Sequence, residues 1–522
     1  MAATRLIKGF MTVGGWTLAS RVLGFARDIL IAAFLGAGPI AEAFLVAFSL
    51  PNMFRRFFAE GAFNMAFVPM FSKKVETGDA PLEFARDAFS GMALLLTAFS
   101  ALGVIFMPGL VWLMASGFAE DERFGLAVVY GRIAFPYILF ISLAALLAGV
   151  LNGLGRFTAA AAAPVLLNVI FILAMLLTTL TGTEGGQALG LRVGDALALS
   201  VPLAGIAQLA LVWWAARRAG YPLRFRRPRM TPELWRLARI AAPAALAGGV
   251  VQVNLLVGRQ VASYFDGAIG WLNYADRLYQ LPLGVVGIAI GVVLLPELSR
   301  RLAAGDLEGQ RNGLNRAAEV SLGLTIPAAV ALMVVPGPLV QALFQRGAFT
   351  TEDAANTALA LTIYGLGLPA FVLQKVLQPL YFAREDTKRP FYYALVSLAL
   401  NAGIAIGLAP FIGFAAAAVG TTLAAWGMVL QLWLGSREMG EVVHMDATLR
   451  RRLPRMLLSA ALMGLALWGF SWLAAPMFAP GGARAIALLL LVALGAMVYF
   501  GCGQVVGAFR LADFRGALKR RG

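Results

Sequence analysis

Four arginines lie inside long apolar stretches of the sequence: Arg21, Arg27, Arg55 and Arg277. An ionised side chain in hydrocarbon is costly, and it usually faces a water-filled cavity or a partner. The planar guanidinium fork makes bidentate, charge-assisted hydrogen bonds to carboxylate and phosphate groups. The four arginines therefore predict a binding site for an anionic cargo, such as a diphosphate. A purely structural role for them is the alternative.

Other polar side chains share these apolar stretches. Arg56 and Glu60 are spaced i,i+4, so they can neutralise each other across one turn of helix. Arg27 and Asp28 are neighbours that point to different faces of a helix, so we expect no ion pair between them. The further candidates for contact with the cargo, or for support of its site, are Ser20, Asp28, Glu42, Asn52, Glu60, Asp276 and Gln280.

The scarcity of cysteine and histidine excludes several kinds of chemistry. Cys502 is the single cysteine, so no intrachain disulfide or thiolate metal site can form. His444 is the single histidine, which excludes a His-based metal site or a Ser-His pair in practice. An enzyme acting on polyprenyl phosphates would need an acidic metal-binding cluster or a histidine nucleophile in a loop, and we find neither. We therefore expect no enzyme, no metal and no cofactor.

The composition indicates which elements position these residues. The chain has 522 residues, of which 60% are hydrophobic and 13% charged, and its mean hydropathy is +0.79. Stretches of about 18 or more apolar residues recur from end to end, and each can cross the bilayer as a helix. We predict an all-α polytopic membrane protein with about fourteen helices. They lie near 10–36, 40–71, 87–115, 124–153, 158–181, 195–215, 233–264, 269–298, 313–343, 356–382, 390–410, 413–435, 453–475 and 485–508.

The basic residues predict the orientation of these helices. If the loops alternate between the two sides of the membrane, most of the 43 Lys and Arg fall on one side. The positive-inside rule then places both termini in the cytoplasm of a bacterial inner membrane. The net charge of +16 is therefore explained by topology and by anionic head groups, and it does not favour a nucleic-acid partner.

An internal repeat divides the chain. The motif VPMFSKK at 68–74 returns 227 residues later as LPELSRR at 295–301, and, when small gaps are allowed, Asn168 aligns with Asn401 at an offset of 233 residues. An offset of six helices predicts two parallel six-helix lobes, residues 1–218 and 219–440, followed by two further helices in 441–522. Two facing lobes are typical of a transporter, because a cavity between them can open to either side. A duplication that records only gene history is the alternative.

Longer motifs resemble a known family. The runs SRVLGFARDILIAAFLGAG, EAFLVAFSLPNMFRRFFAEGAFNMAFVPMFS and WLNYADRLYQLPLGVVGIAIGVVLLPELS are similar to the MurJ (MviN) family of lipid II flippases, within the MOP exporter superfamily. The resemblance implies that the chain flips lipid II from the cytoplasmic to the periplasmic leaflet by alternating access. The lipid's diphosphate would bind cavity arginines, and the two C-terminal helices would form a groove for the polyprenyl tail.

The resemblance also assigns roles to individual residues. Arg21, Arg27, Arg55 and Arg277 match the family's essential arginines, and Glu42 matches its cavity acid. Asp28, Asn52 and Glu60 fall on motif positions that line or support the site. Gln280 stands where we expect an acid.

The sequence says less about the driving force of transport and about the binding partners. The resemblance suggests dependence on membrane potential or an ion, and the ion is unknown. A sodium site is poorly supported, because segments 233–264 and 390–410 contain no acid beyond Glu233. The expected partners are lipid II, membrane lipids and the cell-wall synthesis machinery. The rival functions are a flippase for another lipid-linked oligosaccharide and a MATE-like antiporter, which for cationic drugs would centre on acids.

Overall fold

The structure is a computed structural model that describes residues 2–55, 62–180, 192–479 and 481–509. Within these ranges the regular elements are α-helices and short 3-10 turns, with no strand. The predicted all-α class is therefore confirmed. Each of the predicted membrane segments corresponds to one long helix or to two consecutive helices.

The helices have the following bounds. In the first half they are α1 Ala2–Leu35, α2 Pro39–Arg55, α3 Ala62–Thr77, α4 Pro81–Ile105, α5 Met107–Met114, α6 Glu122–Ala134, α7 Tyr137–Gly153, α8 Thr158–Leu180, α9 Val193–Arg218 and α10 Pro232–Ala262. In the second half they are α11 Ala268–Ala303, α12 Leu307–Val334, α13 Pro336–Leu343, α14 Thr351–Phe382, α15 Lys388–Ile412, α16 Ala415–Ser436, α17 Ala447–Leu473, α18 Ala475–Phe478 and α19 Arg484–Val506. The 3-10 turns η2 and η3 span Ser116–Phe118 and Arg437–Val443.

Three predicted segments, 87–115, 124–153 and 313–343, are each divided into two helices, and a proline stands at each of these three divisions. Pro108 lies in the first turn of α5, Pro136 immediately precedes α7, and Pro336 begins α13. Proline has no N–H to donate, and its ring clashes with the preceding helical turn. The apolar pattern continues across these points, so hydropathy predicts one segment where the backbone forms two.

Ten helices among the described residues are long and apolar enough to cross a membrane. Helix α1 is not one of them, because its apolar run is interrupted by Arg21, Arg27 and Asp28. Helices α1 and α11, which both carry candidate site residues, are thus absent from these ten.

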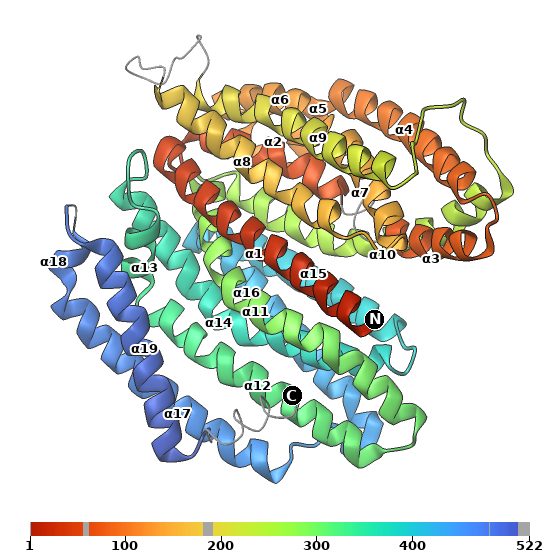
Figure 1. The fold of residues 1–522 in the computed structure, drawn as a ribbon. Helices are drawn as coiled ribbons and strands as arrows, with labels where there is room; N and C mark the ends of the chain where they lie inside the picture. The colour runs from red at the N-terminus through yellow and green to blue at the C-terminus, as the bar shows by residue number, and fades with distance from the viewer. Residues whose placement is uncertain (1, 56–61, 181–191, 480, 510–522) are drawn as a thin grey trace. The chain divides into compact units, whose positions relative to one another are not determined.

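The first compact unit comprises the residues up to 270 and the segment 346–349. In this unit α1 lies along α8, α8 packs on α9, and α2 contacts α6, as the red to yellow-green part of Figure 1 shows. The N–H of Ala348 donates to the carbonyl oxygen of Ala33 at 2.8 Å, which ties segment 346–349 to α1. Gly36 has a φ of +62°, and a Cβ there would lie 2.5 Å from the Ala348 carbonyl oxygen. Glycine is required at this approach.

The segment between α9 and α10 follows the surface of the first unit. Arg226 donates from Nε to Oδ1 of Asp87 on α4 at 2.6 Å, and its backbone N–H donates to Oγ of Ser90 at 3.1 Å. The rings of Phe225 and Phe89 lie 5.0 Å apart between centroids. This segment is therefore fixed to α4 by ionic and aromatic contacts.

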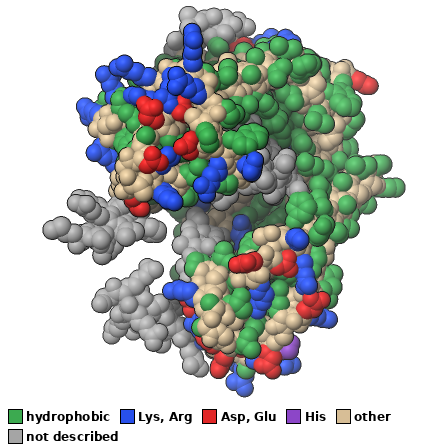
Figure 2. Space-filling view, turned by 90° about the vertical axis from the view of Figure 1, so that its right-hand side faces the viewer, with side chains coloured by type: hydrophobic (Ala, Val, Ile, Leu, Met, Phe, Trp, Pro, Cys, Tyr) green, Lys and Arg blue, Asp and Glu red, His purple; other side chains and the backbone are tan. Residues whose placement is uncertain are grey.

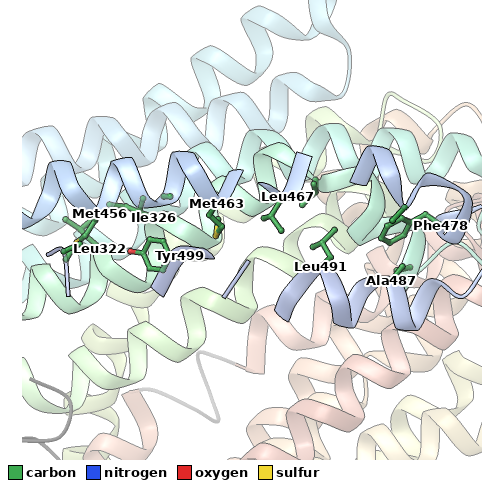
Figure 3. Close-up of a cluster of buried hydrophobic side chains, with 14 residues drawn as sticks. Leu322, Ile326, Met456, Met463, Leu467, Phe478, Ala487, Leu491 and Tyr499 are labelled. Carbon is green, nitrogen blue, oxygen red and sulfur yellow. The ribbon is translucent and has the colours of Figure 1, made fainter. Parts of the chain in front are cut away.

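The second compact unit comprises residues 271–345 and 350–522. Helix α14 packs between α12 and α16, and α15 packs on α16. Helices α17 and α19 pack on each other and on α12 and α13 through a continuous apolar cluster (Figure 3). Tyr499 donates its hydroxyl to the carbonyl oxygen of Gly323 at 2.7 Å within this cluster. The two C-terminal helices are therefore an integral part of the second unit.

These two units are defined by contacts and not by the repeat. Helix α10 contacts α3, α4 and α5 and belongs to the first unit. The lobe limits 1–218, 219–440 and 441–522 rest on the repeat alone and stay a prediction.

The surface of the protein suits a lipid environment. Large apolar side chains are widely exposed, among them Phe411 at 82% and Trp472 at 75%. Figure 2 shows hydrophobic side chains covering broad areas, while charged side chains gather together elsewhere. In water such extensive apolar areas would drive association. They agree with a polytopic membrane protein.

Candidate functional site

The guanidinium of Arg27, on α1, is the centre of the candidate site in the first unit. Its side chain is 9% exposed and lies beside the equally buried carboxylate of Asp28. Nε and Nη2 of Arg27 donate to Oδ1 of Asp28 at 3.1 and 2.7 Å. Nη1 donates to Oδ1 of Asn168, on α8, at 3.1 Å. Two helices therefore hold one guanidinium through three hydrogen bonds.

The prediction that Arg27 and Asp28 would not pair is wrong. Their Cα–Cβ bonds leave α1 in different directions, but the arginine stem is long enough to fold back toward the neighbouring carboxylate. Both side chains are buried, and an uncompensated buried charge costs several kcal/mol. The free-energy cost of leaving either buried charge without a partner outweighs the tendency of neighbouring side chains on a helix to point in different directions.

Helix α8 supplies the rest of the environment of Arg27. Nδ2 of Asn168 donates to the carbonyl oxygen of Ser20 at 3.0 Å and approaches the Ser20 Oγ at 3.4 Å. The ring of Phe171 lies under the guanidinium, with 5.6 Å between the ring centroid and Cζ of Arg27. Sequence reasoning used Asn168 only to align the repeat and did not identify Phe171. The signal available in the sequence was an asparagine within an apolar helix, one helical turn before an aromatic residue.

Glu42, on α2, occupies a separate buried cluster. Its carboxylate is 1% exposed, and Oε2 accepts from Nη1 of Arg123 at 2.8 Å. Oε1 accepts from the backbone N–H of Ile269 at 3.0 Å. Nη2 of Arg123 also pairs with Asp121 at 2.5 Å and with Asp266 at 2.9 Å. One arginine thus connects three carboxylates.

Arg123 is a structural partner that the sequence reasoning missed. It was one of the few basic residues in loops assigned to the outer side, and this isolation was the available signal. Phe118 supports the guanidinium from one face, with 4.4 Å between the ring centroid and Cζ. Burial disfavours the ionised form of Asp121, but the hydrogen bonds from Arg123 outweigh it and lower the pKa of Asp121. In this conformation the Glu42 carboxylate forms an ion pair with Arg123. A role for Glu42 in cargo binding stays a prediction.

The remaining candidates of the first unit lie on α1 and α2. Arg21 is exposed on α1, and Arg55 is the half-buried last residue of α2. Asn52 lies one turn before Arg55 and donates from Nδ2 to the carbonyl oxygen of Phe48 at 2.9 Å. Glu60, together with Arg56, lies outside the described residues.

The second unit contributes three candidates on α11. Arg277 and Asp276 are half-buried, and Gln280 is exposed. Nε2 of Gln280 donates to Oδ2 of Asp276 one turn earlier, so the amide at this position supports a carboxylate. Arg277 belongs to a different unit from the other three arginines, and the convergence of all four on one cargo stays a prediction.

An apolar groove runs along α17 in the second unit. It has a volume of about 580 Å³ and is lined by Val330 and Val334 of α12 and by Ala461, Gly464, Leu465 and Trp468 of α17. A Cβ on Gly464 would lie 2.9 Å from Cγ1 of Val330, so the missing side chain allows α17 to approach α12 closely. The lining offers dispersion contacts and no charge, which suits a hydrocarbon chain.

A second pocket, of about 340 Å³, lies near the C-terminal end of α17. Polar groups line part of it, including Gln341, Gln345, Thr351 and Ser471. Among the residues that the structure describes, no group of three or more His, Cys, Asp or Glu side chains is placed to hold a metal ion.

Comparison with known proteins gives one consistent family. Residues 31–488 match the family model described as lipid II flippase MurJ. A relative from Rhizobium meliloti (strain 1021), named probable lipid II flippase MurJ, is 45% identical over 524 residues, covering 99% of this chain and 96% of the relative. The lipid II flippase MurJ of Burkholderia cenocepacia is 36% identical over 519 residues, covering 98% of this chain and 99% of its own length.

Solved structures agree on the fold. A lipid II flippase MurJ in an inward closed conformation superposes with a TM-score of 0.76 at 24% identity, covering 95% of this chain and 98% of that chain. An inward-facing multidrug resistance MATE family transporter of the MOP superfamily superposes with a TM-score of 0.65 at 14% identity, covering 81% of this chain and 95% of that chain. These two likenesses concern the fold alone.

The family model covers most of the chain, and the relatives align along nearly their whole length. The motifs around Arg27, Arg55 and Arg277 lie within or just before the matched region. The chain belongs to the lipid II flippase MurJ family.

Proposed function

We propose that this protein moves lipid II, the lipid-linked peptidoglycan precursor, from the cytoplasmic to the periplasmic leaflet of the bacterial inner membrane. The relatives are named for this activity, and the chain shares their family along nearly its full length. The single structural observation that carries the proposal is the buried guanidinium of Arg27, which has the geometry to take a diphosphate oxygen.

The diphosphate is the part of the cargo that Arg27 recognises. Asp28 occupies the Nε and Nη2 edge of the guanidinium with a single oxygen, as a phosphate oxygen would. Cargo that binds this edge replaces one anion by another, so Arg27 keeps an anionic partner, while the Asp28 carboxylate loses its two hydrogen bonds to Arg27. We assign Arg21, Arg55 and Arg277 to the same cargo, with Asn52, Asp276 and Gln280 as supporting side chains.

The polyprenyl tail needs an apolar path, and the groove along α17 supplies one. Its lining by valine, leucine, tryptophan, alanine and glycine side chains matches a branched hydrocarbon. Leu465 and Trp468 on its rim are each more than 60% exposed, so a chain can enter from the lipid without unfolding the helix.

Translocation breaks no covalent bond, so the protein acts by changing conformation. Solved MATE transporters of similar fold occur in inward-facing and in outward-facing conformations. We infer alternating access for this chain, with both termini in the cytoplasm and with membrane potential or an ion as the driving force. The arginine-rich segment between α9 and α10 lies on the cytoplasmic side in this orientation.

An antiporter of cationic drugs is less well supported. Such a transporter needs acidic side chains available for a cation, whereas Asp28 is paired with Arg27 and Glu42 is paired with Arg123. A flippase for a different lipid-linked oligosaccharide would use the same arginines, and only the cargo distinguishes it.

Depletion of the protein, followed by localisation of lipid II, tests the function. We expect lipid II to accumulate in the cytoplasmic leaflet within the time that growth continues, and expression of the intact chain to reverse this. Normal export of lipid II in depleted cells would overturn the proposal. Accumulation of a different lipid-linked oligosaccharide would identify the rival flippase.

A further inference from the structure

Asn168 and Phe171 lie three residues apart on α8, on the face that contacts α1. Asn168 is buried, with 5% of its surface exposed. Its Nδ2 donates to the carbonyl oxygen of Ser20, a group that can only accept. The amide therefore has one orientation, and its Oδ1 faces Nη1 of Arg27 at 3.1 Å.

Phe171 restrains the same guanidinium from its face. The side chain is 1% exposed, and its ring packs against Phe44 and Phe48 of α2, at centroid distances of 6.0 and 5.4 Å. Because the ring is buried and packs against two aromatic side chains of α2, its position beside Arg27 is restrained. The plane of the guanidinium is thus set by α8, with support from α2.

The hydrogen bonds of Arg27 divide into a neutral side and an anionic side. The Nη1 side meets the uncharged amide of Asn168, and the Nε and Nη2 edge meets the carboxylate of Asp28. An incoming anion competes with Asp28 for the charged edge. It gains little by displacing a neutral amide, which keeps its own bond to Ser20.

We propose that Asn168 is a positioning residue, which fixes Nη1 of Arg27 while the Nε and Nη2 edge exchanges Asp28 for a phosphate oxygen of the cargo. Phe171 fixes the plane in which this exchange occurs. The inference rests on the proposed function for the identity of the cargo, and on the contacts of Arg27 for the mechanism.

The repeat supplies a matched control. Asn401, on α15, aligns with Asn168 in the sequence and is fully buried in the second unit. A Cβ on Gly420 of α16 would lie 2.7 Å from its Oδ1, so Asn401 sits in a tight contact between α15 and α16. Loss of this amide changes helix packing at a position outside the Arg27 cluster.

The test compares Asn168→Leu with Asn401→Leu in the full-length protein reconstituted in liposomes. We expect Asn168→Leu to raise the KM for lipid II about tenfold while kcat stays within about twofold, because one charge-assisted hydrogen bond is lost. Asn401→Leu should leave KM unchanged. Phe171→Leu, which keeps apolar volume, should raise KM by about threefold and provides a second variant if Asn168→Leu inserts poorly.

Combination with Arg27→Lys shows whether Asn168 acts through Arg27. Lysine lacks Nη1, so adding Asn168→Leu to Arg27→Lys should change KM by less than about twofold. A further tenfold rise in the double variant, or an unchanged KM in well-inserted Asn168→Leu, would overturn the positioning role.

Binding of inorganic pyrophosphate to the purified protein separates this inference from the proposed function. We expect the Kd of Asn168→Leu for pyrophosphate to be about tenfold higher than that of the wild type. If the wild type fails to move lipid II, the proposed function is wrong, and the pyrophosphate comparison still decides the role of Asn168. Equal Kd values for the two proteins contradict it.

Discussion

At the scale of single residues, two sets of buried charges in the first unit contain candidate site residues. Arg27 and Asp28 balance each other within α1, and Asn168 adds a neutral bond. Arg123 balances Glu42 and Asp121 near the start of α6. The first set has an edge on which one anion can replace another, whereas the second set connects segments distant in sequence. We therefore assign cargo binding to the first set and stability to the second.

The first prediction concerns the guanidiniums. Arg27→Ala, Arg55→Ala and Arg277→Ala should each abolish complementation of a flippase-depleted strain, because each removes a bidentate phosphate donor. At least one Arg→Lys variant should also be impaired, since lysine keeps the charge and loses the fork. Growth rate and membrane abundance are measured together. Arg217→Ala, at an exposed position on α9, should grow as the wild type does. Full growth of all three alanine variants at normal abundance contradicts the assignment.

The second prediction concerns the Glu42–Arg123 pair. Arg123→Gln leaves a carboxylate that is 1% exposed without its main partner, and we expect a destabilisation of about 3–5 kcal/mol. Glu42→Gln removes that unpaired charge, so the double variant should recover much of the loss. Thermal unfolding in detergent checks the order of the three proteins. Additive losses in the double variant would show that the two side chains are not energetically coupled.

At the scale of elements, α8 and α17 have different tasks. Helix α8 presents Asn168 and Phe171 to α1, where both side chains contact the guanidinium of Arg27. Helix α17 presents small and apolar side chains to α12, where a groove without charge remains. Helix α19 packs on α17 and contacts α13, and the apolar cluster around Leu467 and Leu491 lies among these helices (Figure 3).

The third prediction follows from the groove. Ala461→Phe fills part of its volume without adding a charge, so insertion should be preserved while the tail is excluded. Transport of long-chain lipid II should fall about tenfold, and transport of a short-chain analogue should change by less than about twofold. Leu462→Phe, on the same helix outside the groove lining, is the control. Equal loss for both analogues in well-inserted protein would mean that α17 and α19 only brace the fold.

The sequence predicts an element well where apolar length determines it, and poorly where contacts between distant residues determine it. Apolar length determines where helices lie, so the predicted segments are recovered, but hydropathy misses the divisions at Pro108, Pro136 and Pro336. The Arg27–Asp28 ion pair was not predicted, because the directions of the two side chains on the helix were considered without the free-energy cost of burying either charge alone. Arg123 and Phe171 were missed because their partners, Glu42 and Arg27, lie far away in sequence.

At the scale of the whole molecule, the chain forms two compact units, and the second unit contains two apolar core clusters. Arg27 and Arg55 belong to one unit and Arg277 to the other. The affinity for a cargo that binds all of these arginines would therefore change if the units move relative to each other. This is the property that alternating access requires.

The fourth prediction concerns access from water. After replacement of Cys502, cysteine at Ser20 or Asn52 should react with a membrane-impermeant thiol reagent in at least one conformational state. Both positions are half-buried on otherwise apolar helices, so an aqueous path is needed to reach them. Depletion of lipid II or collapse of the membrane potential should change the labelling. If neither position reacts from either side, a buried ion-pair network without a cavity is the better account.

The central claim is that this protein moves lipid II and binds its diphosphate through Arg27. The most direct measurement is the rate at which purified full-length protein transfers head-group-labelled lipid II across a liposome membrane, for the wild type and for Arg27→Ala at equal insertion. We predict rapid transfer by the wild type and at least about a tenfold slower rate for Arg27→Ala. Transfer by the wild type at the rate of protein-free liposomes, or undiminished transfer by Arg27→Ala, would contradict the claim.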